Sequence, residues 1–180
     1  MKFIDTWVNT LRNPENTFKA EKGNANLRNG VKHIAVGAAA SGLITAILIL
    51  LSGTGIVGPI VTIIIYPIIA IISALVLAAI IYLIAGILGG KGEYGTHFGL
   101  MAYFYAPMII IVTLLGLIPG LGGIPNLLAG LYALYMLVAS TKEAYQLSAT
   151  RAVIACLVSC VIFAIPIVLA AIMLGGPSVQ

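Results

Sequence analysis

Five long apolar stretches alternate with short polar connections along the chain. A bilayer's hydrocarbon core is about 30 Å thick, and a helix of about 20 mostly apolar residues crosses it. We therefore expect an all-α membrane protein, a bundle of five transmembrane helices, whose transmembrane domain occupies residues 31–174. The expected spans are residues 31–51, 60–88, 97–117, 124–140 and 152–174.

Two of these stretches depart from the usual length. At 1.5 Å per residue, the second would reach about 43 Å, which is longer than tilting a straight helix normally accommodates. Either Pro67 bends this helix, or residues 60–66 lie near the outer interface. The fourth stretch is near the lower limit for a crossing. A hairpin that enters and returns is an alternative for such a pair, although the lengths favour full crossings.

A different pattern opens the chain, where apolar side chains between residues 3 and 12 share one arc of about 140° on a helical wheel. This division predicts a short N-terminal amphipathic helix, which Pro14 ends because the residue before a proline disfavours helix. The helix either lies in the inner membrane interface, anchored by Trp7, or packs beneath the bundle. Its apolar residues are Phe3, Ile4, Trp7, Val8 and Leu11.

The positive charges indicate the orientation of the bundle. All nine Lys and Arg residues lie before or at the start of the first stretch, or in the connections after the second and fourth. The other connections carry no charged side chain. Because basic connections stay inside, residues 1–30 are expected to be a cytoplasmic segment and residues 175–180 an extracytoplasmic tail.

Composition agrees with lipid as the main solvent of this chain. Hydrophobic residues make up 61% of it and charged residues only 8%, against about 25% charged in soluble domains. The formal net charge of +4 is too small for a nucleic-acid footprint, and it suits a membrane with an anionic inner face.

Candidate chemistry is sparse. The apolar stretches contain no Asp, Glu, Lys or Arg away from their ends, which argues against a proton- or ion-coupled transporter. His97 and Glu93 have a spacing that could bind a metal ion, but two ligands favour a surface hydrogen-bonded pair instead. We expect no enzyme activity, no cofactor and no metal site.

Small residues recur every fourth position along the fifth stretch and would let helices approach closely in lipid. The contact is either within one bundle or between copies, in which case the chain forms a homo-oligomer. Cys156 and Cys160 lie one turn apart on this ridge, where a disulfide would distort the helix. The ridge consists of Ser148, Ala152, Cys156, Cys160 and Ala164.

Tyr103 lies too deep in the third stretch for an interfacial aromatic belt, so its hydroxyl is expected to have an internal partner. The carbonyl that Pro107 leaves free is one candidate, because proline lacks a backbone donor and disrupts the helix there. On this interpretation Tyr103→Phe destabilises the bundle.

Several motifs together resemble the Yip family of five-span membrane proteins, which interact with Ypt/Rab GTPases. The first is Pro14-x-x-Thr17-Phe18 after the amphipathic start, followed by the residue 27–30 lead and the Gly-Gly-Lys-Gly loop at residues 89–92. Residues 102–107 resemble the Gly-Tyr-Ser-Leu-x-Pro element, matching at Tyr103 and Pro107. The family's Asp-Leu-Tyr-Gly-Pro element has no counterpart, and the short N-terminal segment resembles prokaryotic-type members in a cell membrane.

Two functions are compatible with these features. The resemblance and the one-sided charges favour a non-enzymatic scaffold or adaptor that binds membrane or cytoplasmic proteins, shapes the bilayer, or does both. The alternative is a passive channel or facilitator for a small solute, because helices interrupted by Pro and Gly often line transport sites.

Overall fold

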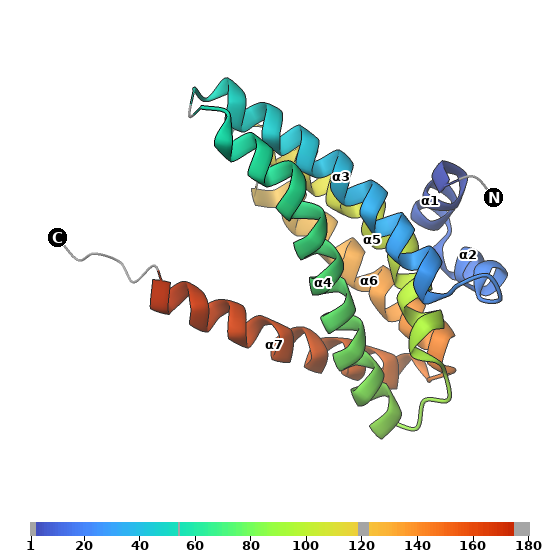
Figure 1. Cartoon of the computed structure of the whole chain (residues 1–180). Coiled ribbons are helices and arrows are strands. Elements are labelled where there is room, and N and C mark those ends of the chain that lie inside the picture. The colour runs from blue at the N-terminus through green and yellow to red at the C-terminus, as the bar shows by residue number, and fades with distance from the viewer. Residues whose placement is uncertain (1–2, 54, 119–122, 175–180) are drawn as a thin grey trace.

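The computed structural model describes residues 3–53, 55–118 and 123–174, and within them the chain is helical with short connections (Figure 1). Two short helices precede five long ones. The short helices are α1 (Phe3–Arg12) and α2 (Pro14–Glu21). The long helices are α3 (Leu27–Leu51), α4 (Val57–Ile87), α5 (Tyr94–Gly116), α6 (Gly123–Tyr145) and α7 (Ala149–Leu174).

Local sequence explains where the first helices begin and end. Helix α1 stops before Pro14, and Pro14 then opens α2, where its missing N–H is not needed. Asn26 caps α3, because its side-chain oxygen accepts the backbone N–H of Asn29 at 2.9 Å. The chain therefore turns twice within residues 3–27 before it enters the first long helix.

All five long helices are long and apolar enough to cross a membrane, which confirms the predicted all-α architecture of five spans. Helix α4 is continuous over 31 residues, and Figure 1 shows it bending in the half that contains Pro67. Helix α5 also continues through Pro107, which the sequence placed at a disruption. Helix α6 runs on to Tyr145, so it has 23 residues and is longer than the apolar stretch inside it.

Helix α5 forms the centre of the bundle, with α3, α4 and α6 packed around it. The α5 side chains from His97 to Met108 are almost all buried, including Phe98, Met101 and Phe104. Helix α7 packs on α4 and α6 through its first half, and Figure 1 shows its other end diverging from the bundle. Lipid is the natural solvent for that exposed apolar half.

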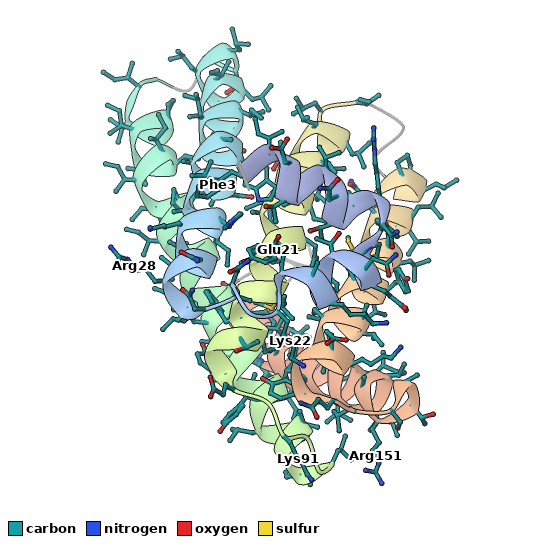
Figure 2. All side chains as sticks on the ribbon, turned by 90° about the vertical axis from the view of Figure 1, so that its right-hand side faces the viewer. Phe3, Glu21, Lys22, Arg28, Lys91 and Arg151 are labelled. Atoms are coloured by element: carbon teal, nitrogen blue, oxygen red, sulfur yellow. The ribbon has the colours of Figure 1, made fainter. Side chains whose placement is uncertain are left out.

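One end of the bundle carries the charge. The described charged residues lie in α1 and α2, in the α2–α3 turn, at the starts of α3 and α7, at the end of α6, and in the α4–α5 connection. The connections at this end bond to each other: Lys91 donates its backbone N–H to the Tyr145 carbonyl at 3.0 Å. Arg151 donates to the Leu88 carbonyl at 3.3 Å. We call this the charged end, and Figure 2 shows Lys91 and Arg151 there.

Candidate functional site

Helix α1 is fixed to the bundle at two points along its length. The indole N–H of Trp7 donates to Nδ1 of His33 on α3 at 2.8 Å. Near the other end of α1, the Tyr132 hydroxyl of α6 donates to the Leu11 carbonyl. Phe3 adds a ring contact, with its centroid 4.2 Å from that of His33. The amphipathic helix is thus a strap across α3, α5 and α6.

The strap has three different flanks. Thr6 and Thr10 form the buried flank, at 4% and 0% exposure, so the helix meets the bundle through polar side chains. On one side of them Ile4 and Val8 are exposed, at 69% and 38%. On the other side the polar residues of α1 face α2 across a shallow groove. The helix therefore packs on the bundle and leaves Ile4 and Val8 uncovered, and its location in the inner membrane interface stays a prediction.

Helix α2 lies between the strap and the charged end in both views of the molecule (Figures 1 and 2). Phe18 is fully buried against Phe104 of α5, with ring centroids 6.3 Å apart. Pro14 and Thr17 are buried as well, and the Thr17 hydroxyl donates to the Asn13 carbonyl at 2.9 Å. Lys22 pairs with Glu143 of α6 at 3.4 Å. Through these contacts, the segment that contains the Pro14, Thr17 and Phe18 motif is packed against the bundle.

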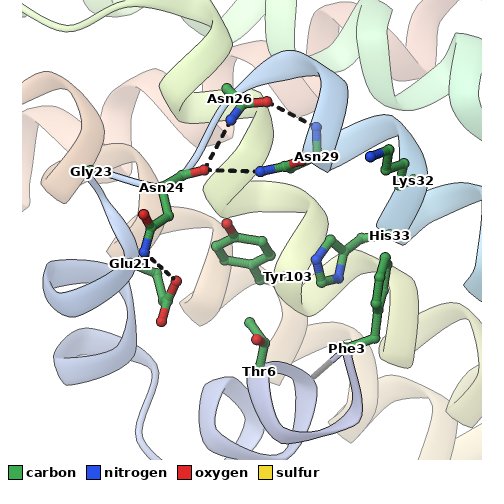
Figure 3. A pocket seen from close by; sticks show the side chains of 10 residues that line it. All are labelled: Phe3, Thr6, Glu21, Gly23, Asn24, Asn26, Asn29, Lys32, His33 and Tyr103. Carbon is green, nitrogen blue, oxygen red and sulfur yellow. Dashed lines mark hydrogen bonds between the residues drawn. The ribbon is translucent and has the colours of Figure 1, made fainter. Parts of the chain in front are cut away.

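A polar cavity of about 500 Å³ lies between the strap, the α2–α3 turn and the start of α3 (Figure 3). Its volume is within the usual range for small-molecule pockets, about 300–1,000 Å³. Tyr103 of α5 closes one wall, and the turn contributes amide side chains that bond to the Asn24 carbonyl. The lining residues are Phe3, Thr6, Glu21, Gly23, Asn24, Asn26, Asn29, Lys32, His33 and Tyr103.

The Tyr103 side chain is 3% exposed, and its hydroxyl points into this cavity (Figure 3). Within the described residues it makes no hydrogen bond, so the expected bond to the carbonyl freed by Pro107 is absent and that expectation was wrong. The bond does not form because the Tyr103 ring extends toward the strap, where it packs against His33 with ring centroids 4.8 Å apart. Pro107 is buried farther along α5, where Gly37 of α3 lets the neighbouring Ala106 backbone come close.

A family model supplies the relationship to known proteins: the Yip1 domain model matches residues 8–172. The chain belongs to the Yip family. Searches of curated proteins and of solved structures each found no match to it. The matched region includes the second half of α1 and all of α2, together with the five long helices up to residue 172. This protein is thus a multi-pass membrane protein of the Yip family.

A second polar cluster lies inside the Yip1 domain, and the sequence did not reveal it. The Thr141 hydroxyl of α6 lies 3.1 Å from Nε2 of His97 on α5, and it accepts from the Cys156 thiol of α7 at 3.3 Å. His97 is fully buried, so the expected surface pair with Glu93 was wrong. The long helices extend past the apolar stretches. Their ends pack around His97 and form a part of the core that the apolar stretches alone do not predict.

This cluster joins three helices through one hydroxyl. His97, Thr141 and Cys156 are all fully buried, so each needs a hydrogen-bond partner inside the protein. The described residues contain no group of three or more His, Cys, Asp or Glu that could hold a metal ion. We assign the cluster to the packing of α5, α6 and α7, because its partners are protein groups from those three helices.

The small-residue ridge of α7 is divided between two environments. Ala152 and Cys156 are fully buried against the bundle, whereas Cys160 is half-buried and Ala164 is exposed. Both cysteines are free thiols. The first half of the ridge therefore packs within one chain, and the second half is open to lipid or to another helix.

Proposed function

We propose that this Yip-family protein is a non-enzymatic membrane scaffold that holds an amphipathic wedge in the cytoplasmic leaflet. The observation that carries the proposal is the strap, which is fixed at Trp7 and at Leu11 while Ile4 and Val8 stay uncovered. A wedge must transmit force to the bundle, and a helix bonded at two points does this better than one on a flexible tether.

The position of α1 supports an interfacial location. Its polar flank faces α2, whereas Ile4 and Val8 are exposed and touch neither α2 nor the polar groove. An amphipathic helix lies with its apolar face buried about 5–10 Å into the boundary of headgroups and acyl chains. Ile4 and Val8 would then displace lipid in one leaflet only, which bends a bilayer.

The same arrangement presents a protein-binding surface on the cytoplasmic side. Helix α2 places Glu15 and Lys19 at its exposed face, and the end of α6 and the start of α7 add Lys142 and Arg151. Such mixed charges suit a membrane or cytoplasmic protein partner rather than a nucleic acid. Packing around α5 favours the scaffold over a solute channel, because large side chains fill the centre of the bundle.

Liposome remodelling tests the wedge. The full chain is reconstituted at increasing protein-to-lipid ratios, and vesicle diameters are measured by electron cryomicroscopy. Wild type should produce smaller vesicles or tubules, and the double variant Ile4→Ser, Val8→Ser should not. Asn9→Ser, on the polar flank, is the matched control and should behave as wild type. Equal remodelling by wild type and the Ile4, Val8 variant would contradict the proposal.

Partner binding is tested separately in native membranes. A photo-crosslinking residue at Lys19, on exposed α2, should capture a reproducible protein, and the same residue at Leu83 on the lipid-facing side of α4 should not. Recovery of lipid alone at Lys19 would argue against an adaptor role and would leave the wedge as the protein's activity.

A further inference from the structure

The cavity beneath the strap is lined by three buried polar side chains with free hydrogen-bonding capacity. Thr6, His33 and Tyr103 are 4%, 7% and 3% exposed. His33 accepts the Trp7 N–H at Nδ1, so in the neutral ring Nε2 carries the proton and is a donor. Within the described part of the chain, neither this N–H nor the hydroxyls of Thr6 and Tyr103 has a partner. These side chains line the cavity, so a polar molecule seated in it can pair with all three groups.

The cavity also carries one charge of each sign. Lys32 of α3 and Glu21 of α2 lie toward opposite ends of it (Figure 3). The ion pair between described residues is Lys22 with Glu143, so Lys32 and Glu21 have no counter-charge within the described chain. Glu21 accepts one hydrogen bond, from the Asn24 amide at 3.2 Å. A ligand that suits both ends has an anionic group near Lys32 and a cationic group near Glu21.

The depth of the two ends in the membrane decides which ligand has that order. Lys32 and His33 lie in the second turn of α3, beyond Asn26 and toward the apolar part of the helix. Glu21 belongs to α2, on the side of the charged end. Phe3, which lines the cavity, is 39% exposed, and Val36, one helical turn beyond Lys32 on α3, is 49% exposed, so both offer apolar surface near the Lys32 end. The anionic group therefore lies nearer the hydrocarbon, and the cationic group nearer the cytoplasm.

We propose that this cavity binds the headgroup of an ethanolamine phospholipid. The lipid's phosphate receives hydrogen bonds from the Lys32 ammonium and the His33 Nε2–H, and the Tyr103 hydroxyl bonds to the headgroup nearer Glu21. Its terminal ammonium donates to the Glu21 carboxylate, and its acyl chains leave past Phe3 and Val36. A choline headgroup has no N–H to donate to Glu21, and a glycerol headgroup brings no cation to it. The site therefore selects ethanolamine.

This inference goes beyond the wedge, because it concerns the cavity and not the apolar flank of Ile4 and Val8. Native mass spectrometry of the full chain in detergent tests it, with equimolar ethanolamine, choline and glycerol phospholipids of identical acyl chains. Wild type should retain the ethanolamine lipid at least several-fold over the other two. Free phosphoethanolamine in excess should not displace it, because the acyl chains add to the binding.

Variants assign the two ends of the headgroup. Glu21→Gln should lower ethanolamine binding about tenfold, the value of one charge-assisted hydrogen bond, and so remove the preference. Lys32→Gln should weaken binding of all three lipids, because all carry the phosphate. Glu93→Gln and Lys91→Gln make the same charge changes in the α4–α5 connection and should bind as wild type does.

Three results would overturn the proposal. They are equal retention of the three lipids, an unchanged preference in Glu21→Gln, and displacement by free phosphoethanolamine, which would assign the cavity to a soluble ligand. Glu21→Asp keeps the charge but withdraws it from the cavity, and it should also reduce the preference. It is measured beside Glu21→Gln so that a folding defect in the neutral variant leaves the test intact. Loss of lipid selectivity with normal vesicle remodelling would refute this site without affecting the wedge.

Discussion

Trp7 and His33 are 26 residues apart and are joined by a hydrogen bond of 2.8 Å, from the indole N–H to Nδ1 of the imidazole. This bond connects the amphipathic strap to the first long helix. It also determines which imidazole nitrogen carries the proton of the neutral ring, because the nitrogen that accepts from Trp7 cannot carry it. The only Trp of the chain therefore has two roles, as an anchor of α1 and as the group that orients a cavity donor.

A double-mutant cycle measures this bond. Trp7→Phe keeps an aromatic ring and removes the donor, and His33→Leu removes the acceptor. Each single variant should lower the free energy of unfolding in detergent, and the coupling energy between them should be about 1 kcal/mol. Phe3 contacts the His33 ring without a hydrogen bond, so a cycle of Phe3→Leu with His33→Leu is the control and should give a smaller value. A Trp7–His33 coupling near zero would show that the strap is held by other contacts.

The buried Thr141 hydroxyl should contribute measurably to the stability of the bundle, because two buried side chains bond to it. Thr141→Val removes the partner of both His97 and Cys156 and keeps the shape, so two buried polar groups are left unpaired. The expected loss of unfolding free energy is about 1–3 kcal/mol. Chemical denaturation in detergent measures it.

Thr113→Val is the matched control, because the Thr113 hydroxyl bonds only to the Ile109 carbonyl of its own helix. That substitution should have little effect. Equal unfolding midpoints for the Thr141 and Thr113 variants would show that the cluster contributes nothing to the packing of α5, α6 and α7.

The sequence predicted the parts of the fold that depend on apolar length and helical period. Five apolar runs become five long helices, and the amphipathic period of residues 3–12 becomes α1. These features are local, so they can be derived from neighbouring residues. The helical-wheel pattern did not predict which flank of α1 packs on the bundle. Thr6 and Thr10 are on the polar side of the wheel and are nevertheless buried against the bundle.

The functional features that were missed are non-local. His97 was expected in a surface pair because of its spacing from Glu93, whereas Thr141 and Tyr145 of α6 pack against it in the fold. The cavity needs Glu21, Lys32 and Tyr103 from three separate segments, and nothing in their spacing indicates that they meet. Of these three residues, the sequence singled out only Tyr103, through its depth in the third stretch and through the family resemblance.

Tyr103→Phe distinguishes the two interpretations of this tyrosine. The sequence suggested an internal hydrogen bond, and hence a loss of stability on removing the hydroxyl. In the structure the hydroxyl has no partner among the described residues, so the variant should unfold at the wild-type midpoint in lipid-free detergent. Tyr94→Phe is a useful comparison, because the Tyr94 hydroxyl donates to the Leu75 carbonyl at 3.0 Å and its loss should destabilise. A lower midpoint for Tyr103→Phe would restore the original interpretation.

Cysteine labelling tests the proposed orientation, with a cytoplasmic charged end and the other end outside. In a background with Cys156→Ala and Cys160→Ala, single cysteines replace Lys91, Ile56 and Ile118. An impermeant maleimide should label positions 56 and 118 in intact cells, and position 91 only after permeabilisation. Protection of position 118 from both sides would instead indicate that α5 and α6 form a hairpin inside the membrane.

A close approach of α3 to α5 at Gly37 gives a stability prediction. A Cβ on Gly37 would lie 2.5 Å from the Ala106 carbonyl oxygen, a backbone atom that cannot move aside as a side chain can. Gly37→Ala should therefore push apart the two helices that form the cavity and should lower the unfolding free energy by about 1–3 kcal/mol.

Gly86→Ala in α4 is the matched control for Gly37→Ala. A Cβ there meets no atom within 4 Å, and alanine favours helix over glycine by about 1 kcal/mol, so this variant should be neutral or more stable. Both unfolding midpoints are measured in the same detergent. Because Gly37 lies one turn beyond His33 on α3, Gly37→Ala should also weaken ethanolamine-lipid retention, whereas Gly86→Ala should leave it unchanged. A Gly37→Ala protein as stable as wild type would mean that α3 and α5 are farther apart in the membrane than their contact here requires.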